Sequence, residues 1–431
     1  MLTDNITRRS DGTLCFAGQS VPELAGRYGT PLYLMDEDRI RANCRMYREA
    51  FRAHFGDGAL PLYASKAACF KQMYRIVAEE GLGVDCVSVG EIHTALQAGF
   101  PAEKIYYHGD GKTDADIAYA LAQGVGCFVV DNGNELITLE EEAAARGIRQ
   151  KILLRITPGI DPHTYQAVNT GAVDVKFGVP VETGQAMEFV RAALSMEHVE
   201  VAGLHCHVGS MVFGEDVYQR TIDIMLAFIK EVKDELGLEF EELNLGGGYG
   251  VRYEESDPAI DIPARLGEVA AHLKQRAAEY GLRLPRFLME PGRSIVADAG
   301  MTVYTVCSVK RIPGYKSYAI VDGGMADNPR YCLYGSRYTV LHAQRSGGLR
   351  AIFDLAGRAC ESGDIIQPAI SLPNNTARGD LVAVCTTGAY NYAMASHYNR
   401  LPKPPVVMLR GGESYVAVRR ETIEDVCAMD I

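Results

Sequence analysis

Eight short apolar segments recur along the first two-thirds of the chain, and Ala-rich stretches with helical periodicity separate them. Most of the segments are continuous apolar runs, which is typical of parallel strands that are buried on both faces. The expected strands span residues 60–65, 84–89, 104–108, 127–131, 152–157, 201–207, 243–246 and 287–290. Helix candidates such as 217–236 and 264–280 lie between them. Eight consecutive βα units predict a TIM (β/α)8 barrel, because the competing doubly wound sheet rarely needs so many parallel strands in succession.

The pattern changes after residue 293. Helical periodicity largely disappears, and Gly and Pro turns separate apolar runs that we expect to be strands, at 301–311, 317–321, 365–370, 380–385 and 414–418. A further expected strand at 31–35 can join them. The sequence therefore predicts an α/β fold with a barrel domain over residues 37–291. A C-terminal all-β domain takes residues 292–431 together with the N-terminal residues 1–36.

Charge and cysteine content exclude several classes of protein. The 43 basic and 55 acidic residues give a net charge of −12, which argues against a nucleic-acid binder. No apolar run approaches the ~18 residues that a membrane helix needs, and the polar N-terminus is unlike a secretory signal. The 11 cysteines include no CxxC pair, so we expect reduced thiols and a cytoplasmic protein. Because 205–207 (His-Cys-His) lacks further ligands at zinc spacing, we expect no metal.

Polar residues stand near the carboxyl-terminal end of each expected barrel strand. TIM barrels carry their chemistry at this end, so the pattern predicts an active site there. The residues are Lys66, Asp85, Ser88, His108, Asp131, Arg155, His207, Gly246, Gly247, Gly248 and Glu290.

Lys66 follows the first of these strands. Burial at a barrel mouth disfavours a charged amine, and a lowered pKa makes the amine nucleophilic, as a Schiff base requires. The alternative is a lysine whose ammonium reaches solvent, and from this segment alone that alternative is the commoner case.

Two anion-binding features follow the seventh and eighth strands. Gly246, Gly247 and Gly248 allow backbone N–H groups to approach an anion closely, although their spacing is not that of a dinucleotide-binding motif. Glu290-Pro291-Gly292-Arg293 supplies a carboxylate and a guanidinium at the position where TIM barrels often bind phosphate. A lysine, a phosphate site and a carboxylate together suggest pyridoxal 5'-phosphate, with Lys66 as the Schiff base and Glu290 on the pyridine nitrogen. In this interpretation His207 stacks on the ring and Ser210 contributes to phosphate binding.

The sequence resembles the fold-type III pyridoxal-phosphate decarboxylases, and among them most closely the diaminopimelate decarboxylases. The resemblance covers nearly the whole chain in order. Its motifs are 63–67 (YASKA), 203–210 (GLHCHVGS), 245–248 (LGGG), 290–293 (EPGR), 321–325 (VDGGM), 328–330 (NPR), 333–335 (LYG), 360–364 (CESGD) and 388–390 (GAY).

The resemblance implies a role for each matching residue. It makes Lys66, Cys360, Glu290 and His207 the catalytic residues, with Cys360 returning a proton to the product. The implied cofactor contacts are Lys66, His207, Ser210, Gly246, Gly247, Gly248, Glu290, Pro291, Gly292, Arg293 and Tyr390. The implied substrate contacts are Arg293, Arg330, Tyr334, Glu361 and Tyr390. Cys360 and Glu361 would reach the neighbouring subunit's site, so the resemblance implies a homodimer with shared active sites.

The expected reaction is the decarboxylation of meso-2,6-diaminopimelate, a small amino acid, to L-lysine and CO2. The far end of this substrate keeps its carboxylate, which suits the planar fork of Arg330, and its ammonium suits Glu361. Two alternatives remain open. One is a related decarboxylase that acts on another basic amino acid or on carboxynorspermidine, and the other is a non-catalytic regulator with the same fold.

Overall fold

The computed structural model describes residues 2–160 and 174–431, which form two compact units. Unit 1 comprises Met1–Ala42, Val251–Ala259 and Arg293–Ile431, and unit 2 comprises Asn43–Gly250 and Ile260–Gly292. The short segment Val251–Ala259, which follows the glycine run, packs with unit 1, although its sequence position lies inside the predicted barrel domain.

Unit 2 is a closed barrel of eight parallel strands, which confirms the predicted TIM barrel. Each strand pairs with the next, and the last strand pairs with the first, so that the sheet has no free edge. The strands are β5 (Leu60–Ala64), β6 (Gly83–Cys86), β7 (Ile105–Tyr107), β8 (Cys127–Val130), β9 (Gln150–Thr157), β11 (Val199–His205), β12 (Glu242–Asn244) and β13 (Arg286–Met289). The short β10 (Val179–Pro180) pairs only with β9.

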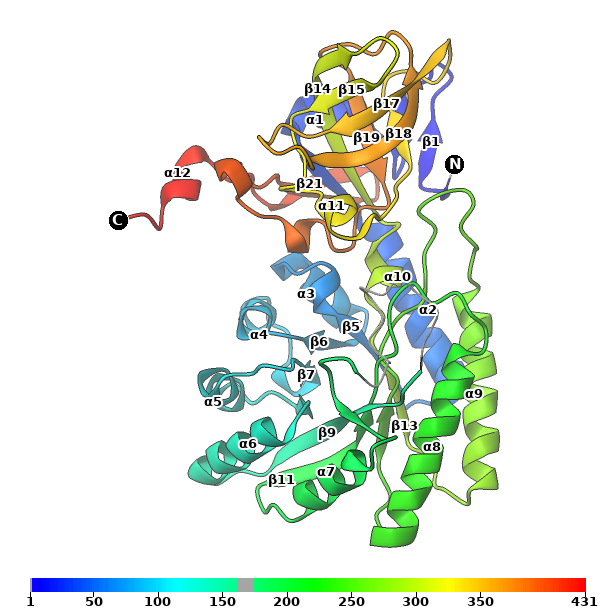
Figure 1. The fold of residues 1–431 in the computed structure, drawn as a ribbon, viewed down its shortest axis with the longest axis vertical. Coiled ribbons are helices and arrows are strands. Elements are labelled where there is room, and N and C mark those ends of the chain that lie inside the picture. The colour runs from blue at the N-terminus through cyan, green and yellow to red at the C-terminus, as the bar shows by residue number, and fades with distance from the viewer. Residues whose placement is uncertain (1, 161–173) are drawn as a thin grey trace. The chain divides into compact units, whose positions relative to one another are not determined.

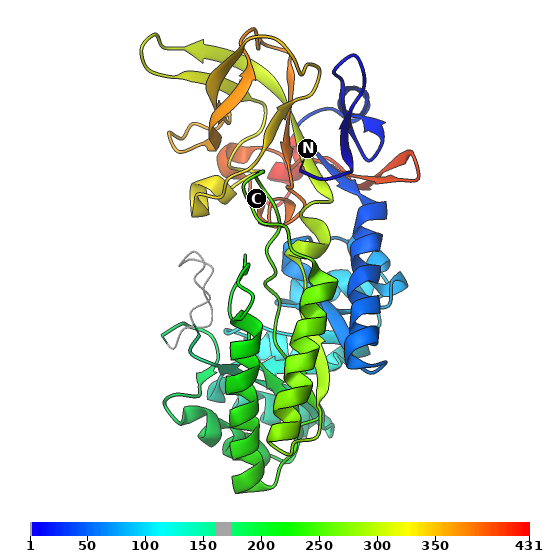
Figure 2. The same ribbon diagram turned by 90° about the vertical axis from the view of Figure 1, so that its right-hand side faces the viewer.

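The barrel helices lie around the outside of the strands (Figures 1 and 2). They are α3 (Lys71–Glu79), α4 (Val89–Gln97), α5 (Asp114–Ala122), α6 (Gly133–Arg146), α7 (Gln185–Leu194), α8 (Val217–Leu236) and α9 (Ile262–Glu279), and α2 (Glu37–Phe55) precedes β5. Polar caps fix several helix starts: the side chains of Ser88, Thr113 and Asn132 accept backbone N–H bonds at the starts of α4, α5 and α6. Among the described residues, no helix combines the length and apolarity needed to cross a membrane.

Apolar side chains fill the barrel interior, including Leu62, Tyr106, Val129, Leu153 and Leu288. A charged cluster lies at the opposite end of the strands from Lys66 and Glu290. Glu242, the first residue of β12, is 2% exposed, and its carboxylate lies 2.5 Å from Lys151 Nζ and 2.8 Å from Arg286 Nη1. A buried carboxylate paired with two basic side chains therefore lies at the amino-terminal end of the barrel.

Unit 1 is built on a nine-stranded sheet with a central path β18-β17-β15-β14-β4-β20-β21, to which β16 and β19 attach. Strand β4 (Leu32–Asp36) lies between β14 and β20, which confirms that an N-terminal strand joins the C-terminal β domain. The other strands are β14 (Gly300–Arg311), β15 (Ser317–Val321), β16 (Val340–His342), β17 (Arg350–Ala356), β18 (Ile365–Pro373), β19 (Leu381–Cys385), β20 (Val406–Arg410) and β21 (Glu413–Val418).

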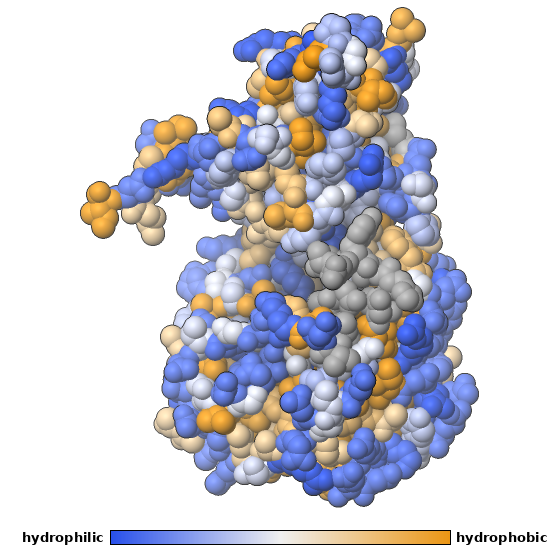
Figure 3. Space-filling view, viewed as in Figure 1, coloured by the Kyte–Doolittle hydropathy of each residue, from blue (hydrophilic) through white to orange (hydrophobic). Residues whose placement is uncertain are grey.

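Smaller elements complete unit 1. A three-stranded sheet of β1 (Ile6–Arg8), β2 (Leu14–Phe16) and β3 (Gln19–Ser20) precedes α1 (Val21–Tyr28). Three short helices follow later in the chain: α10 (Arg293–Val296), α11 (Arg330–Tyr334) and α12 (Ile423–Cys427). The chain end beyond α12 exposes apolar side chains: Met429 is 91% accessible, and the C-terminal tip is coloured as hydrophobic in Figure 3.

Candidate active site

Glu290 is the centre of a buried polar cluster at the carboxyl ends of the barrel strands. Asn244 Nδ2, at the end of β12, donates a hydrogen bond of 2.7 Å to Glu290 Oε1. His108 Nε2 lies 2.9 Å from the same oxygen, and His205 Nε2 lies 3.3 Å from Oε2. Burial alone would raise the pKa of Glu290, but the two histidines outweigh it and hold the pKa well below its usual range. The carboxylate is therefore ionised at neutral pH.

Asp85, in β6, is the second buried carboxylate of this cluster. Its oxygens accept no hydrogen bond within the described part of the chain, and they lie 3.8 Å from Lys66 Nζ and 3.9 Å from His108 Nε2. Burial raises the pKa of Asp85, although His108 and Lys66 oppose this effect. Lys66 itself follows β5 in a short 3-10 turn, and its side chain is 41% accessible. The barrel thus presents an accessible amine beside a buried acid.

Burial has the opposite effect on the histidines. It lowers the pKa of His205 to about 4, and it lowers the pKa of His207 well below its usual value. His205 therefore meets Glu290 as a neutral imidazole. Nitrogen and oxygen atoms of His108, His205 and Glu290 all lie within 4.8 Å of one another, as metal ligands can, but here the three side chains already contact one another.

The glycines after β12 are fixed by close backbone contacts. A Cβ atom on Gly247 would lie 2.1 Å from the Glu290 carbonyl oxygen, and one on Gly248 would lie 2.4 Å from the Gly209 carbonyl oxygen. The Val212 N–H donates to the Gly248 carbonyl, which joins the loop that carries Ser210 to the glycine run. The loops after β11, β12 and β13 therefore meet backbone to backbone, at a distance that only glycine permits at these positions.

This arrangement fits pyridoxal phosphate. The accessible amine of Lys66 suits the aldehyde, the ionised Glu290 suits a protonated ring nitrogen, and the glycine loops suit a phosphate. Asp85, whose buried oxygens accept no hydrogen bond from a described residue, places a second carboxyl group beside the amine.

Unit 1 contributes a separate cluster of arginines and tyrosines. Arg293 Nη1 donates a hydrogen bond of 2.6 Å to Tyr253 Oη, and its guanidinium lies 4.7 Å from the centre of the Tyr390 ring. The Arg330 guanidinium lies 5.2 Å from the centre of the Tyr390 ring and 5.0 Å from that of Tyr334. The structure thus brings together four residues predicted from the sequence: Arg293, Arg330, Tyr334 and Tyr390.

Arg330 is buried without a matching negative charge. It is 5% exposed, and within the described ranges it forms no ion pair with a carboxylate. Its Nε atom makes no hydrogen bond there, and its Nη1 atom has only a 3.9 Å contact to Met394 Sδ. Because an unpaired buried charge is costly, such a guanidinium is suited to bind an anion from outside the chain.

Cys360 and Glu361 differ from the other predicted residues because both are exposed. They lie in the turn between β17 and β18, where the Cys360 N–H donates to Asn399 Oδ1 and Glu361 Oε1 accepts the Gly363 N–H at 3.0 Å. These local hydrogen bonds hold the turn. The structure gives Glu361 no basic partner among the described residues of this chain.

Sequence analysis missed several members of these clusters. It named His108 and His205 without a link to Glu290, and it gave Asn244 and Tyr253 no role. Asn244 had a signal, because a polar residue ends an apolar strand directly before the glycine run. Tyr253 had none that we recognise.

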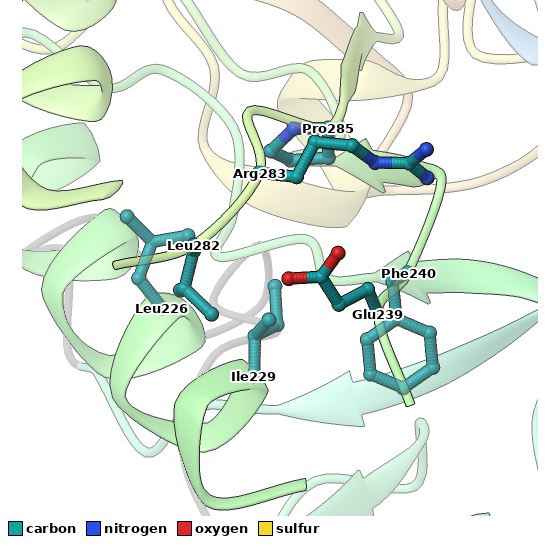
Figure 4. A pocket seen from close by; sticks show the side chains of 7 residues that line it. All are labelled: Leu226, Ile229, Glu239, Phe240, Leu282, Arg283 and Pro285. Atoms are coloured by element: carbon teal, nitrogen blue, oxygen red, sulfur yellow. The ribbon is translucent and has the colours of Figure 1, made fainter. Parts of the chain in front are cut away.

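A small cavity lies elsewhere in unit 2, beside α8 and the segments that lead into β12 and β13 (Figure 4). Its walls are mostly apolar, and its one acid, Glu239, pairs with Lys233 at 2.6 Å. The lining residues are Leu226, Ile229, Glu239, Phe240, Leu282, Arg283 and Pro285. None of them belongs to either cluster described above.

Comparison with known proteins identifies the family. Residues 37–297 match the model of the pyridoxal-dependent decarboxylase, pyridoxal binding domain. A diaminopimelate decarboxylase of Bacillus subtilis is 41% identical over 421 residues, which cover 97% of this chain and 95% of that protein. The chain belongs to the diaminopimelate decarboxylase family. As a member it is a carbon–carbon lyase, and pyridoxal phosphate is its cofactor.

Solved structures of this family share the fold of both units. A diaminopimelate decarboxylase from M. jannaschii in complex with L-lysine is 32% identical and has a TM-score of 0.91, with 100% of this chain and 99% of that chain covered. A lysine/ornithine decarboxylase from Vibrio vulnificus, in complex with cadaverine, is less similar, at 26% identity and a TM-score of 0.76, with coverage of 90% and 97%.

Proposed function

We propose that this chain decarboxylates meso-2,6-diaminopimelate to L-lysine and CO2, the last step of lysine biosynthesis. The observation that carries the choice of substrate is Arg330, a buried guanidinium without a carboxylate partner among the described residues. Diaminopimelate keeps a carboxylate at its non-reacting end, which can pair with this guanidinium through two parallel hydrogen bonds. Ornithine and lysine lack that group and would leave Arg330 unpaired.

The barrel residues are proposed to hold and tune the cofactor. Lys66 binds it covalently through its amine, and the ionised Glu290 keeps the ring nitrogen protonated. When bound, pyridoxal phosphate supplies an electron sink for the pair of electrons that the departing carboxylate leaves behind. His207 would flank the ring of the bound cofactor. The proposed phosphate and ring contacts are Ser210, Gly246, Gly247, Gly248, Pro291, Gly292, Arg293 and Tyr390.

The residues of unit 1 are proposed to recognise the substrate. Arg330 binds the far carboxylate, and the rings of Tyr334 and Tyr390 hold the guanidinium in place through cation–π contacts. Arg293, fixed by Tyr253, adds positive charge to the same cluster. Glu361 pairs with the far ammonium.

We also propose a homodimer in which Cys360 and Glu361 serve the active site of the neighbouring subunit. Both residues are exposed on this chain, and Glu361 has no basic partner here among the described residues, which supports a role toward a second copy. Cys360 then returns a proton to the product carbon.

Mixing two inactive variants tests the shared site. Equal amounts of Lys66→Ala and Cys360→Ala subunits, dissociated and reassociated, should recover about a quarter of wild-type activity, because half of the dimers are mixed and each mixed dimer has one intact site. Each variant alone should remain nearly inactive. Failure of the mixture to recover activity, despite subunit exchange, contradicts the shared site.

The cytoplasm is the proposed compartment. All 11 cysteines of the chain lie among the described residues, and every one is a free thiol. Free thiols are typical of proteins in reducing compartments.

Product release from purified protein with pyridoxal phosphate tests the reaction. We would supply meso-diaminopimelate, L-lysine, L-ornithine, L-arginine and carboxynorspermidine in parallel, and measure CO2 and the amine product. We expect turnover with diaminopimelate alone. Preferred turnover of any other substrate would keep the cofactor chemistry and refute the role of Arg330.

A further inference from the structure

His108 contacts both buried carboxylates of the barrel, and the proposed function leaves it without a role. Its side chain is 5% exposed, and its Nε2 atom lies 2.9 Å from Glu290 Oε1 and 3.9 Å from Asp85 Oδ1. Its ring meets the His205 ring edge to face, with 4.8 Å between the ring centres. One imidazole thus connects the acid beside Lys66 with the acid assigned to the ring nitrogen.

The two carboxylates depend on His108 to different degrees. Glu290 has two further contacts, to Asn244 and His205, of which His205 is neutral at pH 7. Asp85 accepts no hydrogen bond from the described residues, and its charged or titrating neighbours include Lys66 and His108. Because both acids are buried, the nitrogen near both of them has a large effect on their charge and orientation.

We propose that His108 is a positioning residue for the decarboxylation, which fixes the Glu290 carboxylate and links it to Asp85 beside Lys66. The inference rests on the proposed roles of Glu290 and Lys66. Through Glu290, His108 would favour protonation of the cofactor's ring nitrogen. Through Asp85, it would influence the electrostatic environment of the Lys66 amine. His108 needs no contact with the substrate for either effect.

Other charged or titrating groups also influence this site, and a pH profile must account for them. They lie in or directly after six neighbouring elements: Asp85 in β6, Glu290 after β13, His205 in β11, Lys66 after β5, Arg155 in β9 and Glu91 in α4. A direct measurement at the ring nitrogen avoids this overlap.

The decisive experiment loads the apo-protein with pyridoxal phosphate labelled with ¹⁵N in the ring and records the ¹⁵N chemical shift of the holoenzyme without substrate. The shift separates a protonated ring nitrogen from a neutral one. We expect a protonated nitrogen in the wild type, a shift toward the neutral form in His108→Leu, and a smaller shift in His108→Gln, whose amide can still donate to Glu290. The control His272→Gln removes a histidine that pairs with Asp223 at 2.9 Å on the exterior helix α9, and it should leave the signal unchanged.

Kinetics give a second measurement. Loss of the 2.9 Å contact between His108 and the buried Glu290 carboxylate predicts a fall in kcat of about 10- to 100-fold in His108→Leu, with KM changed by less than about threefold. A wild-type ¹⁵N shift and kcat in both variants would overturn the proposal. If His108→Leu does not bind the cofactor, the His108→Gln signal decides, because an unchanged shift refutes the proposal and a displaced shift supports it. Inactivity of the wild type toward diaminopimelate would overturn the proposed function and leave the ¹⁵N test intact.

Discussion

Replacement of Arg330 with methionine tests the proposed role of this residue in the selection of diaminopimelate. Arg330 is 5% exposed, its guanidinium lies within 5.2 Å of the centres of two tyrosine rings, and its Nε atom has no hydrogen bond to a described residue. Methionine keeps an unbranched side chain that can still pack against the rings. The substitution therefore removes mainly the charge and the donors.

The structure allows an estimate of the effect. Each hydrogen bond to a charged group contributes about 1.5–3 kcal/mol, and the planar fork of Arg330 can make two such bonds to a carboxylate. The loss of both predicts that kcat/KM for meso-diaminopimelate falls about 100- to 10,000-fold, because about 3–6 kcal/mol of transition-state stabilisation is removed. L-Lysine has the same skeleton without the far carboxylate, so its kcat/KM should stay constant or rise.

The assay compares CO2 release from both substrates in the wild type, Arg330→Met and a matched control. Arg337→Met is a suitable control, because Arg337 follows in the same segment, is half exposed and pairs with Glu254 at 3.3 Å. The control should leave the preference for diaminopimelate unchanged. An unchanged preference in Arg330→Met would refute our assignment of the far carboxylate to this residue.

Three further predictions follow from the described contacts. Lys66→Ala should abolish both turnover and the visible absorbance of the bound cofactor, whereas Lys71→Ala, on the exposed side of α3, should leave both intact in the same spectrophotometric assay. Glu242→Ala should lower the free energy of unfolding by about 1–2 kcal/mol, because Lys151 and Arg286 lose their buried partner but are partly exposed to water. The kcat measured well below the lowered Tm should stay within about twofold of the wild type. Burial raises the pKa of Asp327 to about 7, so the folded protein holds this proton more tightly than the unfolded chain and loses stability as pH rises from about 4 to about 7. Asp327→Asn lacks this titration, so urea unfolding should show its stability relative to the wild type increasing between pH 5 and 8, and a constant difference would refute the shifted pKa.

The barrel could be predicted from the sequence because its signal is local and repeated. Each apolar run marks a strand, and α8 begins and ends where the helical pattern predicts, at Val217 and Leu236. Observed strands differ from the predicted ones by one to three residues at their ends, as for β6 (Gly83–Cys86), since the last polar residues of a run belong to the active-site loops.

Unit 1 was harder to predict. Its β16 (Val340–His342) has only three residues, and β17 (Arg350–Ala356) begins with exposed residues that hide its pattern. The prolines before β20 (Val406–Arg410) resemble a turn, yet this strand pairs with β4 deep in the sheet. Pairing partners such as these come from tertiary structure, which no short window of sequence records.

The contacts within the two side-chain clusters were equally difficult to predict from short stretches of sequence. The positions of Lys66 and Glu290 at the carboxyl ends of barrel strands could be predicted from the sequence, because each directly follows an apolar run. The contact between His108 and Glu290 could not, because it joins residues 182 positions apart, and the order of side chains across a barrel mouth depends on strand tilt and closure. The contact of Tyr253 with Arg293 could not be predicted for a different reason. The nine-residue segment Val251–Ala259 belongs to unit 1, although barrel elements precede and follow it in the sequence.

The ion cluster at Glu242 has a consequence for how this enzyme can change. At the amino-terminal strand ends, Glu242 forms ion pairs with two basic side chains. At the carboxyl-terminal strand ends, buried acids lie beside imidazoles, and the pKa values of Asp85 and Glu290 are shifted in opposite directions. Residues that stabilise the fold and residues assigned to the reaction therefore lie at opposite ends of the same barrel. Directed evolution toward new amino-acid substrates should tolerate wide variation in the loops at the carboxyl ends of the strands, as long as Lys151, Glu242 and Arg286 at the opposite end are retained.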